Sequence, residues 1–446
     1  MKIAYIAAGA GGMYCGSCIH DNTTAAALQK LGHDVALLPT YTPMRTDEES
    51  VSTQRVFYGA VGVYLEQKSA FFRKRHRAID WLLSRPALLN LAAKFSGSTD
   101  ARALGELALS VLRGERGDAH KELDELVTWL RDEFKPDLVH ITNSMFLGLV
   151  RTFKAELGVP VVVAVQGEDL FLDELTDEFR ARVVAEMRAR AGEADAFLAP
   201  NRFYARKMAA LLGVPEDKMR IVPLGLKLDG HDAPLHPRPD AAPQGGAAAP
   251  VVGYLARIAP EKGLHILVDA FCRLAQEPGR ENLRLRIAGY LGPKDRPYYK
   301  EVEQRIVAAG LIGRYDFLGE VDRDTKISFL RSLDVFSVPT VYEEAKGLFV
   351  LEALANGVPV VQPRHGSFPE LLGDTGGGVL VEPHSAEALA EGLGRLLNNL
   401  EEGRRLGGAG RAAVLERRGD AQMAEATLAV YESLVAKRLQ SISETS

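Results

Sequence analysis

Two glutamates on either side of a glycine form the most informative pattern in this sequence. Glu344 lies in a polar loop after a predicted strand, and Gly347 opens a helix predicted to run to about Asn356. The first amides of a helix lack intrahelical partners and lie at the positive end of its dipole, so such a start binds phosphate. Glu352, inside the helix and flanked by leucines, needs a partner if it is buried. A ribose diol and a nearby arginine are both suitable partners.

A second pattern places two cations after another predicted strand. Arg257 and Lys262 lie in the strand, loop and helix segment 253–265. Two fixed cations stabilise a departing diphosphate as its charge accumulates. An Arg and a Lys at this spacing are usually surface charges when they occur alone. Because both patterns follow strands in the same half of the chain, we interpret them as parts of one anion site.

The glycine-rich loop after the first predicted strand is a further candidate for contact with phosphate. Gly11 and Gly12 allow the backbone to approach a phosphate closely because they lack side chains. A dinucleotide fold is the rival interpretation, but the loop lacks a complete G-x-G-x-x-G and the second strand ends in Thr40, which is not acidic. Cys15 and Cys18 in this loop form a C-x-x-C, which is typical of small residues in a core, a regulatory disulfide or a metal site.

Taken together, these patterns resemble the group-one (family 4), retaining GT-B glycosyltransferases, which carry two glutamates eight positions apart around a glycine-led helix. The resemblance implies that Glu344 binds hydroxyls of the donor sugar and that Glu352 binds the nucleotide ribose. It assigns the diphosphate to the amides of three residues at the helix start, which are Gly347, Leu348 and Phe349. Arg257 and Lys262 match the family's basic pair, and Gly11 and Gly12 match its glycine pair. The catalytic candidates are therefore Arg257, Lys262 and Glu344.

Two positions depart from the family pattern. Lys346 stands where the family commonly has Phe, and Gln166 stands where it often has a His near the donor sugar. Gln can donate a hydrogen bond to the sugar but cannot act as a base, so an acid or base must lie elsewhere. The nearby candidates for acid, base or acceptor contact are His20, Asp21, Glu168 and Asp169. Helix capping is an equally good interpretation of Glu168 and Asp169.

A D-x-D sequence at 322–324 follows Val321, which the resemblance places near the nucleotide base. In another glycosyltransferase fold, D-x-D holds a divalent metal. Here it precedes a helical pattern, where Asp favours the start of a helix. We therefore expect no required metal and no cofactor.

The elements that position these residues form an α/β pattern from end to end. Short β-branched runs alternate with helical patterns, which predicts parallel sheets. Together with the resemblance, this predicts a GT-B fold with two Rossmann-like domains facing a cleft. The expected strands of the first half are 2–8, 34–40, 137–143, 160–166, 196–201 and 219–225, and those of the second half are 251–257, 283–290, 315–319, 335–339, 359–364 and 378–382.

The expected domains follow from these strands and from composition. Residues 1–228 form an N-terminal, acceptor-side domain with a helical insertion at about 41–130. Residues 229–250 are rich in Pro, Gly and Ala, as exposed linkers are. Residues 251–415 form the nucleotide-sugar domain, and 416–446 form an amphipathic helix that packs back towards the N-terminal domain.

Within the insertion, residues 71–83 mix basic and large apolar side chains. This mixture can lie at an anionic membrane surface, although an ordinary solvated helix face has the same pattern. The net charge of −5 argues against a nucleic-acid partner. Three cysteines and the absence of an apolar run of about 18 residues predict a cytoplasmic protein, with peripheral contact at the inner face of the membrane as a further option.

The sequence therefore predicts a retaining, metal-independent hexosyltransferase of glycan biosynthesis. We expect a UDP- or GDP-sugar as donor, bound as the two domains close, and a glycan, lipid or small molecule as acceptor. The departing phosphate can take the acceptor proton, so no protein nucleophile is needed. Two alternatives remain, which are a GT-B-fold epimerase or phosphorylase and a non-catalytic sugar-nucleotide sensor.

Overall fold

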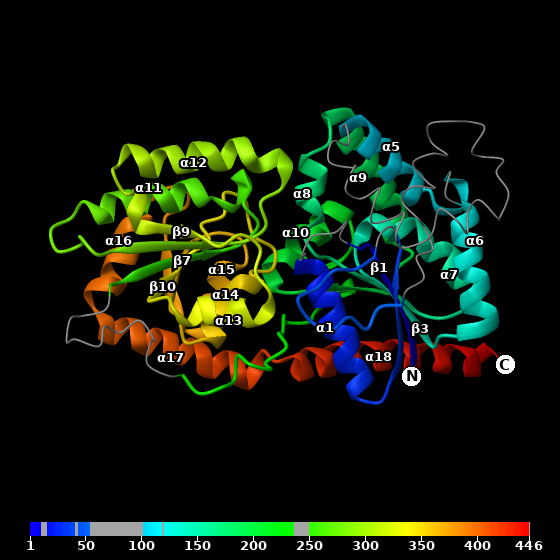
Figure 1. Cartoon of the computed structure of the whole chain (residues 1–446). Helices are drawn as coiled ribbons and strands as arrows, with labels where there is room; N and C mark the ends of the chain where they lie inside the picture. Colours follow the sequence, from blue (N-terminus) through cyan, green and yellow to red (C-terminus); the bar gives the residue numbers. More distant parts are fainter. Residues whose placement is uncertain (10–15, 41–42, 54–100, 118–119, 236–248, 446) are drawn as a thin grey trace. The chain divides into compact units, whose positions relative to one another are not determined.

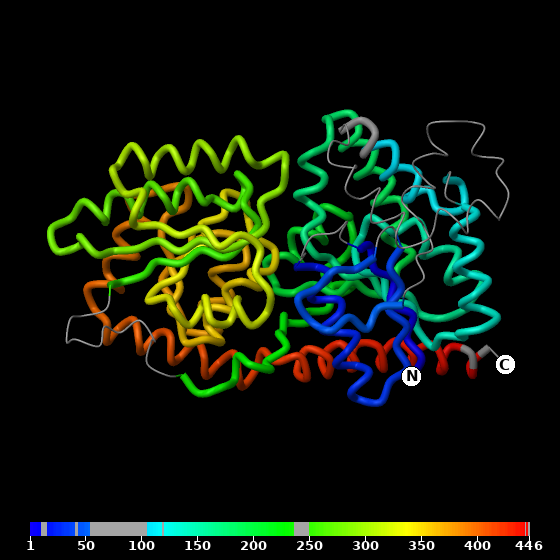
Figure 2. The backbone as a smooth tube through the Cα atoms, in the orientation of Figure 1, coloured from blue at the N-terminus to red at the C-terminus, as the bar shows by residue number. Residues whose placement is uncertain are grey.

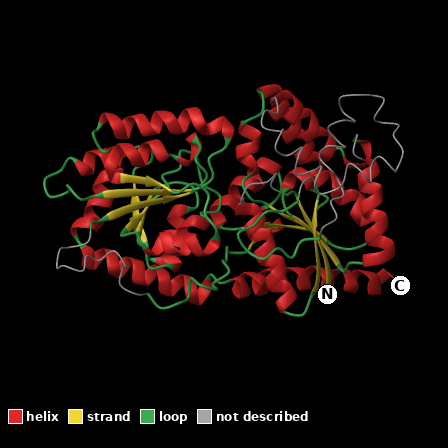
Figure 3. Cartoon of the chain, in the orientation of Figure 1, coloured by secondary structure: helices red, strands yellow, loops and turns green. Residues whose placement is uncertain are grey.

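The computed structural model describes residues 1–9, 16–40, 43–53, 101–117, 120–235 and 249–445 (Figure 1). The chain divides into two compact units, which we name unit 1 (Met1–Leu224 with Asp420–Ser446) and unit 2 (Gly225–Gly419). Each unit contains a six-stranded parallel sheet. Helices cover both faces of each sheet (Figure 3). This arrangement confirms the predicted α/β class.

The sheet of unit 1 has the strand order β2-β1-β3-β4-β5-β6. Its strands are β1 (Lys2–Ala7), β2 (Asp34–Pro39), β3 (Leu138–Ile141), β4 (Val161–Ala164), β5 (Ala196–Ala199) and β6 (Met219–Ile221). Every residue of β3, β4 and β5 is buried. Parallel strands covered on both faces need continuous apolar runs, which is why Val161, Val162 and Val163 follow one another in β4.

The helices of unit 1 bring distant parts of the sequence together. They are α1 (Gly16–Lys30), α5 (Ala101–Leu112), α6 (His120–Trp129), α7 (Val150–Leu157), α8 (Glu168–Asp173), α9 (Asp177–Ala191), α10 (Arg202–Leu212) and α18 (Asp420–Thr445). The C-terminal helix α18 packs against α1, and Figure 2 shows the two tubes side by side. Tyr431 of α18 is fully buried and bonds to His140 Nδ1 of β3, so α18 is part of the core of unit 1.

The sheet of unit 2 has the order β12-β11-β10-β7-β8-β9. Its strands are β7 (Val251–Leu255), β8 (Arg284–Ala288), β9 (Tyr315–Phe317), β10 (Val335–Phe336), β11 (Val360–Pro363) and β12 (Gly378–Val381). Its helices are α11 (Leu264–Ala275), α12 (Arg296–Ala308), α13 (Arg323–Arg331), α14 (Leu348–Ala355), α15 (Phe368–Thr375), α16 (Ala386–Asn398) and α17 (Leu400–Arg417). Helix α11 packs on α16, and α14 packs on α17.

All the expected strands form within their predicted ranges, although each ends at least one residue before its predicted end. The helix predicted after Gly347 forms as α14, and its C-cap is Asn356 as expected. Within the part of the chain that the structure describes, no helix is both long enough and apolar enough to cross a membrane. Several predictions lie outside the described residues, which are those on Gly11, Gly12, Cys15 and the segment 71–83.

The segment expected to be an exposed linker is described only at its ends. Its first part is anchored to unit 2, because Arg331 and Arg411 donate to backbone carbonyls between Gly230 and Ala233. His231 is buried, and its Nδ1 lies 2.7 Å from Asn356 Nδ2. A composition of Pro, Gly and Ala predicts the lack of a periodic apolar face, but it does not reveal such carbonyl contacts.

Candidate active site

The glycine-led helix start of unit 2 forms as the sequence predicts. Gly347 has a φ of 76° and is the N-cap of α14. A residue with a side chain would be strained at this φ, and its Cβ would lie only 3.3 Å from the Leu371 side chain. The first backbone amides of α14 therefore lie next to a residue without a side chain, so an anion can approach them.

Lys262 and Glu344 form an ion pair beside the start of α14. Lys262 Nζ lies 2.8 Å from Glu344 Oε2, and Tyr342 donates its hydroxyl to the same oxygen. The backbone N–H of Lys346 donates to Glu344 Oε1 at 3.2 Å, and Lys262 Nζ lies 5.5 Å from the centre of the Phe349 ring. Two predicted catalytic residues thus lie together at the first turn of α14.

The carboxyl of Glu344 is buried and stays ionised. Burial alone would raise its pKa, but the charge of Lys262 and hydrogen bonds from Lys262, Tyr342 and the Lys346 backbone lower the pKa to about 2. A carboxylate in this state accepts hydrogen bonds and does not donate a proton near neutral pH. It suits the predicted contact with sugar hydroxyls.

Arg257 follows β7 as predicted, and two carboxylates already contact it. Its guanidinium is ion-paired with Glu261 and lies 3.8 Å from Asp295 Oδ2. The side chain of Arg257 is 30% exposed, which leaves part of it accessible. A diphosphate that binds Arg257 therefore has to displace these carboxylates from the guanidinium or bind it alongside them. The spacing of Arg257 and Lys262 in the sequence did not reveal this competition.

Glu352 is buried in α14, and its partner is a lysine that the sequence analysis did not select. Lys326 Nζ of α13 contacts Glu352 Oε1, and both side chains are about nine-tenths buried. Glu352 thus has a basic protein partner, but this partner is a lysine and not the arginine that the sequence analysis considered. The contact of Glu352 with a ribose stays a prediction.

Ser367 is a second residue that sequence analysis missed. Its hydroxyl is buried and has no hydrogen-bond partner among the residues that the structure describes. It lies 3.6 Å from the position that a Cβ on Gly347 would occupy, so it stands beside the start of α14. A buried hydroxyl without a partner is costly, which makes a bound anion its natural partner.

In unit 1, Asp21 is the centre of a buried polar network. It accepts hydrogen bonds from Tyr5 Oη at 3.0 Å, from Gln166 Nε2 at 2.7 Å and from the Thr142 hydroxyl, and His20 Nδ1 lies 3.2 Å away. Burial raises the pKa of Asp21, but its hydrogen bonds and the nearby His20 outweigh burial and hold the pKa below its usual value. These contacts favour a positioning role for Asp21.

The other acidic candidates also have protein partners. Glu168 accepts hydrogen bonds from the backbone of Ser144, Gln166 and Gly167, and also from the hydroxyls of Ser144 and Tyr204. Asp169 accepts from Tyr204 and pairs with Lys207 Nζ at 2.7 Å. Both residues therefore have structural partners, but the prediction that they cap the following helix is wrong, because the N-cap of α8 is Gly167 and no side chain caps it.

His20 differs from the acidic candidates because only one of its ring nitrogens, Nδ1, has a partner among the described residues. Asp21 holds Nδ1 of His20, and this contact orients the imidazole. Its Nε2 makes no hydrogen bond to the described residues. This leaves His20 as the candidate of the four that best fits a contact with an acceptor.

The D-x-D sequence forms a helix start. Asp322 is the N-cap of α13, and its Oδ1 accepts the backbone N–H of Thr325 at 2.8 Å. The predicted helix start is therefore confirmed. Val321 lies in the loop directly before this cap, between β9 and α13.

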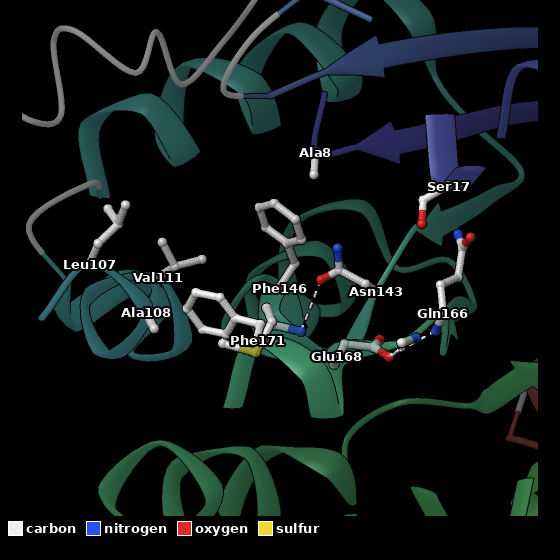
Figure 4. Close-up of a pocket in the computed structure, with 12 residues that line it drawn as sticks. Ala8, Ser17, Leu107, Ala108, Val111, Asn143, Phe146, Gln166, Glu168 and Phe171 are labelled. Atoms are coloured by element: carbon white, nitrogen blue, oxygen red, sulfur yellow. Dashed lines mark hydrogen bonds between the residues drawn. The ribbon is translucent and has the colours of Figure 1, made fainter. Parts of the chain in front are cut away.

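A cavity of about 320 Å³ lies at the carboxyl edge of the sheet in unit 1 (Figure 4). Its wall includes Ala8, Asn143 and Gln166, which follow the neighbouring strands β1, β3 and β4. Ligands of open parallel sheets bind at this edge, because the loops that follow the strands gather there. The remaining wall comes mainly from α5, from the 3-10 helix that contains Phe146 and from Phe171 of α8.

Comparison with solved structures defines the class of fold. Sucrose-phosphate synthase from Thermosynechococcus elongatus superposes with a TM-score of 0.70 at 20% identity, covering 98% of this chain and 99% of that chain. HepE from Anabaena, in complex with UDP and glucose, superposes with a TM-score of 0.67 at 18% identity, covering 97% of this chain and 100% of that chain. The fold is GT-B, as predicted.

Two family models match the chain one after the other. The model described as "Glycosyl transferase 4-like domain" matches residues 22–225, and the model described as "Glycosyl transferases group 1" matches residues 243–413. The chain belongs to the group-1 glycosyltransferases. The predicted family is thus confirmed.

Curated relatives match the chain over part of its length. The D-inositol 3-phosphate glycosyltransferase of Nocardia farcinica is 29% identical over 297 residues, which are 65% of this chain and 60% of that protein. The match spans less than two thirds of that relative. The MMP alpha-(1->4)-mannosyltransferase of Mycolicibacterium hassiacum is 26% identical over 356 residues, which are 77% of each chain.

Proposed function

We propose that this chain transfers a hexosyl group from a nucleoside diphosphate sugar to an acceptor hydroxyl, with retention of configuration. The observation that carries the proposal is the contact between Lys262 and Glu344 at the glycine-led start of α14. It combines a cation, an ionised carboxylate and helix amides, which suit a molecule that has both a diphosphate and sugar hydroxyls. Membership of the group-1 glycosyltransferases supports the same activity.

The diphosphate binds, in this proposal, to Lys262, Arg257 and the amides of Gly347, Leu348 and Phe349. Arg257 exchanges its contact with Glu261 for a phosphate oxygen. Once Arg257 has made this exchange, both cations lie beside the diphosphate before the sugar bond breaks, so they stabilise the charge that builds on the leaving group. They thereby lower the barrier to breaking the bond between the sugar and the phosphate.

The remainder of the donor is assigned to three residues of unit 2. Glu344 accepts hydrogen bonds from sugar hydroxyls, and Glu352 uses Oε2 for the ribose while Lys326 holds Oε1. Val321 contacts the base. UDP- or GDP-sugars are the proposed donors, and the complex of Anabaena HepE with UDP and glucose supports the uridine nucleotide.

In this proposal the acceptor binds at the carboxyl ends of the strands in the sheet of unit 1. The acceptor oxygen bonds to the anomeric carbon on the face that the diphosphate leaves, and its proton passes to the departing phosphate oxygen. His20, oriented by Asp21, contacts the acceptor. Gln166 keeps Asp21 in place, since its amide nitrogen donates to Asp21 and Thr142.

A donor screen tests this function. UDP, GDP, ADP and their glucose and mannose derivatives are added to the protein in a thermal-shift assay, because a ligand of the native state raises stability. Sugar release is then measured with and without EDTA, and we expect equal rates. Lys262→Ala and Glu344→Ala should lose donor turnover, whereas Arg284→Ala, which removes an exposed ion pair with Asp316, should not.

The screen also separates the alternatives. Binding without any turnover indicates a sensor, and a changed or phosphorylated free sugar indicates an epimerase or phosphorylase. If no nucleotide or nucleotide sugar stabilises the protein, the proposed function is wrong.

A further inference from the structure

The cavity of unit 1 has two chemically different ends (Figure 4). One end is apolar and is lined by Leu107, Ala108 and Val111 of α5 with the rings of Phe146 and Phe171. The other end is polar and is lined by Ser17, Asn143 and Gln166. Figure 4 shows the α5 side chains and the polar side chains on opposite sides of the two rings. A ligand that fills this cavity must itself be apolar at one end and polar at the other.

The polar end coincides with the proposed acceptor side. Gln166 Nε2 bonds to Asp21, and Asp21 holds His20, so two hydrogen bonds connect the cavity wall to the group that we assign to the acceptor. Asn143 uses its Oδ1 to cap the turn at Met145, which leaves its amide nitrogen on the side of Ala8 (Figure 4). The acceptor hydroxyl has hydrogen-bonding groups at this end.

The apolar end offers no charge to a ligand. Glu168 is the one ionisable residue among the described residues that line the cavity. Its two oxygens accept hydrogen bonds from Ser144, from the backbone of Gln166 and Gly167 and from Tyr204 of α10, so protein donors already surround its charge. Carbon atoms of α5, Phe146 and Phe171 form the remaining wall. A phosphate or carboxylate in this part would lose its water without gaining a partner.

We propose that this cavity binds an apolar group of the acceptor, so that the acceptor is an amphipathic alcohol whose reactive hydroxyl lies close to an alkyl chain or an aromatic ring. This inference rests on the proposed function and adds the chemical class of the acceptor. The volume of about 320 Å³ lies at the lower end of the range for small-molecule sites, which is roughly 300–1,000 Å³. It suits a short alkyl or single-ring group.

Alkyl glycosides of increasing chain length test the proposal. Methyl, butyl, hexyl and octyl glycosides of glucose, mannose and galactose are offered as acceptors below their micelle-forming concentrations, with the donor found in the screen. We expect the acceptor KM to fall by about fourfold for each methylene that is buried, as transfer free energies predict, until the cavity is full. Equal KM values for methyl and octyl glycosides would overturn the proposal.

Variants of the apolar end provide the matched controls. Ala108→Trp fills the cavity and should remove the dependence on chain length while nucleotide binding stays unchanged. Ala181→Trp makes the same change on an exposed position of α9 and should behave like the wild type. Phe171→Ala enlarges the cavity and should shift the preference to bulkier groups, which keeps the test informative if Ala108→Trp does not fold.

A binding measurement separates this inference from the proposed function. Octyl glucoside is titrated into the protein by calorimetry, and we expect binding in the wild type that Ala108→Trp loses. If that binding is present but no donor is turned over, the transferase function fails and the cavity remains a site for an amphipathic ligand. If donors are turned over but octyl glucoside neither binds nor improves KM, the cavity proposal alone fails.

Discussion

Lys262 Nζ lies 2.8 Å from Glu344 Oε2, and this contact joins two loops at one edge of the sheet of unit 2. Lys262 follows β7, and Glu344 follows β10. The two strands are neighbours in the sheet, so their carboxyl ends deliver a cation and a carboxylate to the same place. The start of α14 lies directly after Glu344 in the chain. The predictions below follow from this site and from the network around Asp21.

The stability of the protein should depend on the ionisation of Glu344. Its pKa falls on folding from 4.5 to about 2, so its contribution to stability is complete above pH 4.5 and is lost as the pH falls towards 2. The contribution is about 3 kcal/mol in the free energy of unfolding. Urea unfolding of the wild type and Glu344→Gln should therefore give a difference that shrinks as the pH falls from about 6 to about 3. A difference that does not change with pH contradicts this account.

Lys326→Met should destabilise unit 2 and weaken nucleotide binding. The substitution leaves the Glu352 carboxylate buried without its partner, which typically costs about 3–5 kcal/mol. The matched control is Arg305→Met, which removes an ion pair with Asp269 that is about 40% exposed on both sides and should cost less than about 1 kcal/mol. Urea unfolding and titration with UDP measure both effects. Equal losses of stability in the two variants would show that the buried pair has no special role.

Ser367→Ala should separate ligand binding from stability. The hydroxyl has no partner among the described residues, so its removal should leave the free energy of unfolding unchanged or slightly higher. If the hydroxyl binds the diphosphate, affinity for the nucleotide should fall roughly tenfold. Ser328→Ala, at an exposed position of α13, is the control. Unchanged nucleotide affinity in Ser367→Ala would remove Ser367 from the site.

Asp21→Asn should destabilise unit 1. The new amide group places N–H donors among groups that already donate, including Tyr5, Thr142 and Gln166. A buried donor that meets other donors costs about 1–3 kcal/mol for each lost bond. Thermal unfolding should therefore begin at a lower temperature than in the wild type, while His20→Asn should unfold close to the wild-type temperature. A fully stable but inactive Asp21→Asn protein would instead make Asp21 a direct participant in catalysis.

The strands and the helix start were predictable because their signals are local. A buried parallel strand is predicted by the three consecutive valines 161–163 alone. The start of α14 is predicted by Gly347, which stands just before an apolar run. The order of the strands in each sheet was not predicted, because it depends on contacts between segments far apart in the chain.

The partners of the site residues could not be read from the sequence for the same reason. Glu352 and Lys326 are 26 positions apart, and Asp21 and Gln166 are 145 positions apart. The spacing of a motif shows which residues share an element, but it does not show which side chain from another element meets them. Ser367 has no local signal, since a serine before a helix is common and its burial beside Gly347 arises only in the folded sheet.

The most direct test of the central claim is to determine the anomeric configuration of the product of one transfer assay. The wild type is incubated with the nucleotide sugar that stabilises it most and with octyl glycosides, and the product is analysed by proton NMR. We predict a new glycoside whose anomeric configuration equals that of the donor, and no such product from Lys262→Ala. A product of inverted configuration, or the same yield from Lys262→Ala, would contradict the assignment of this site.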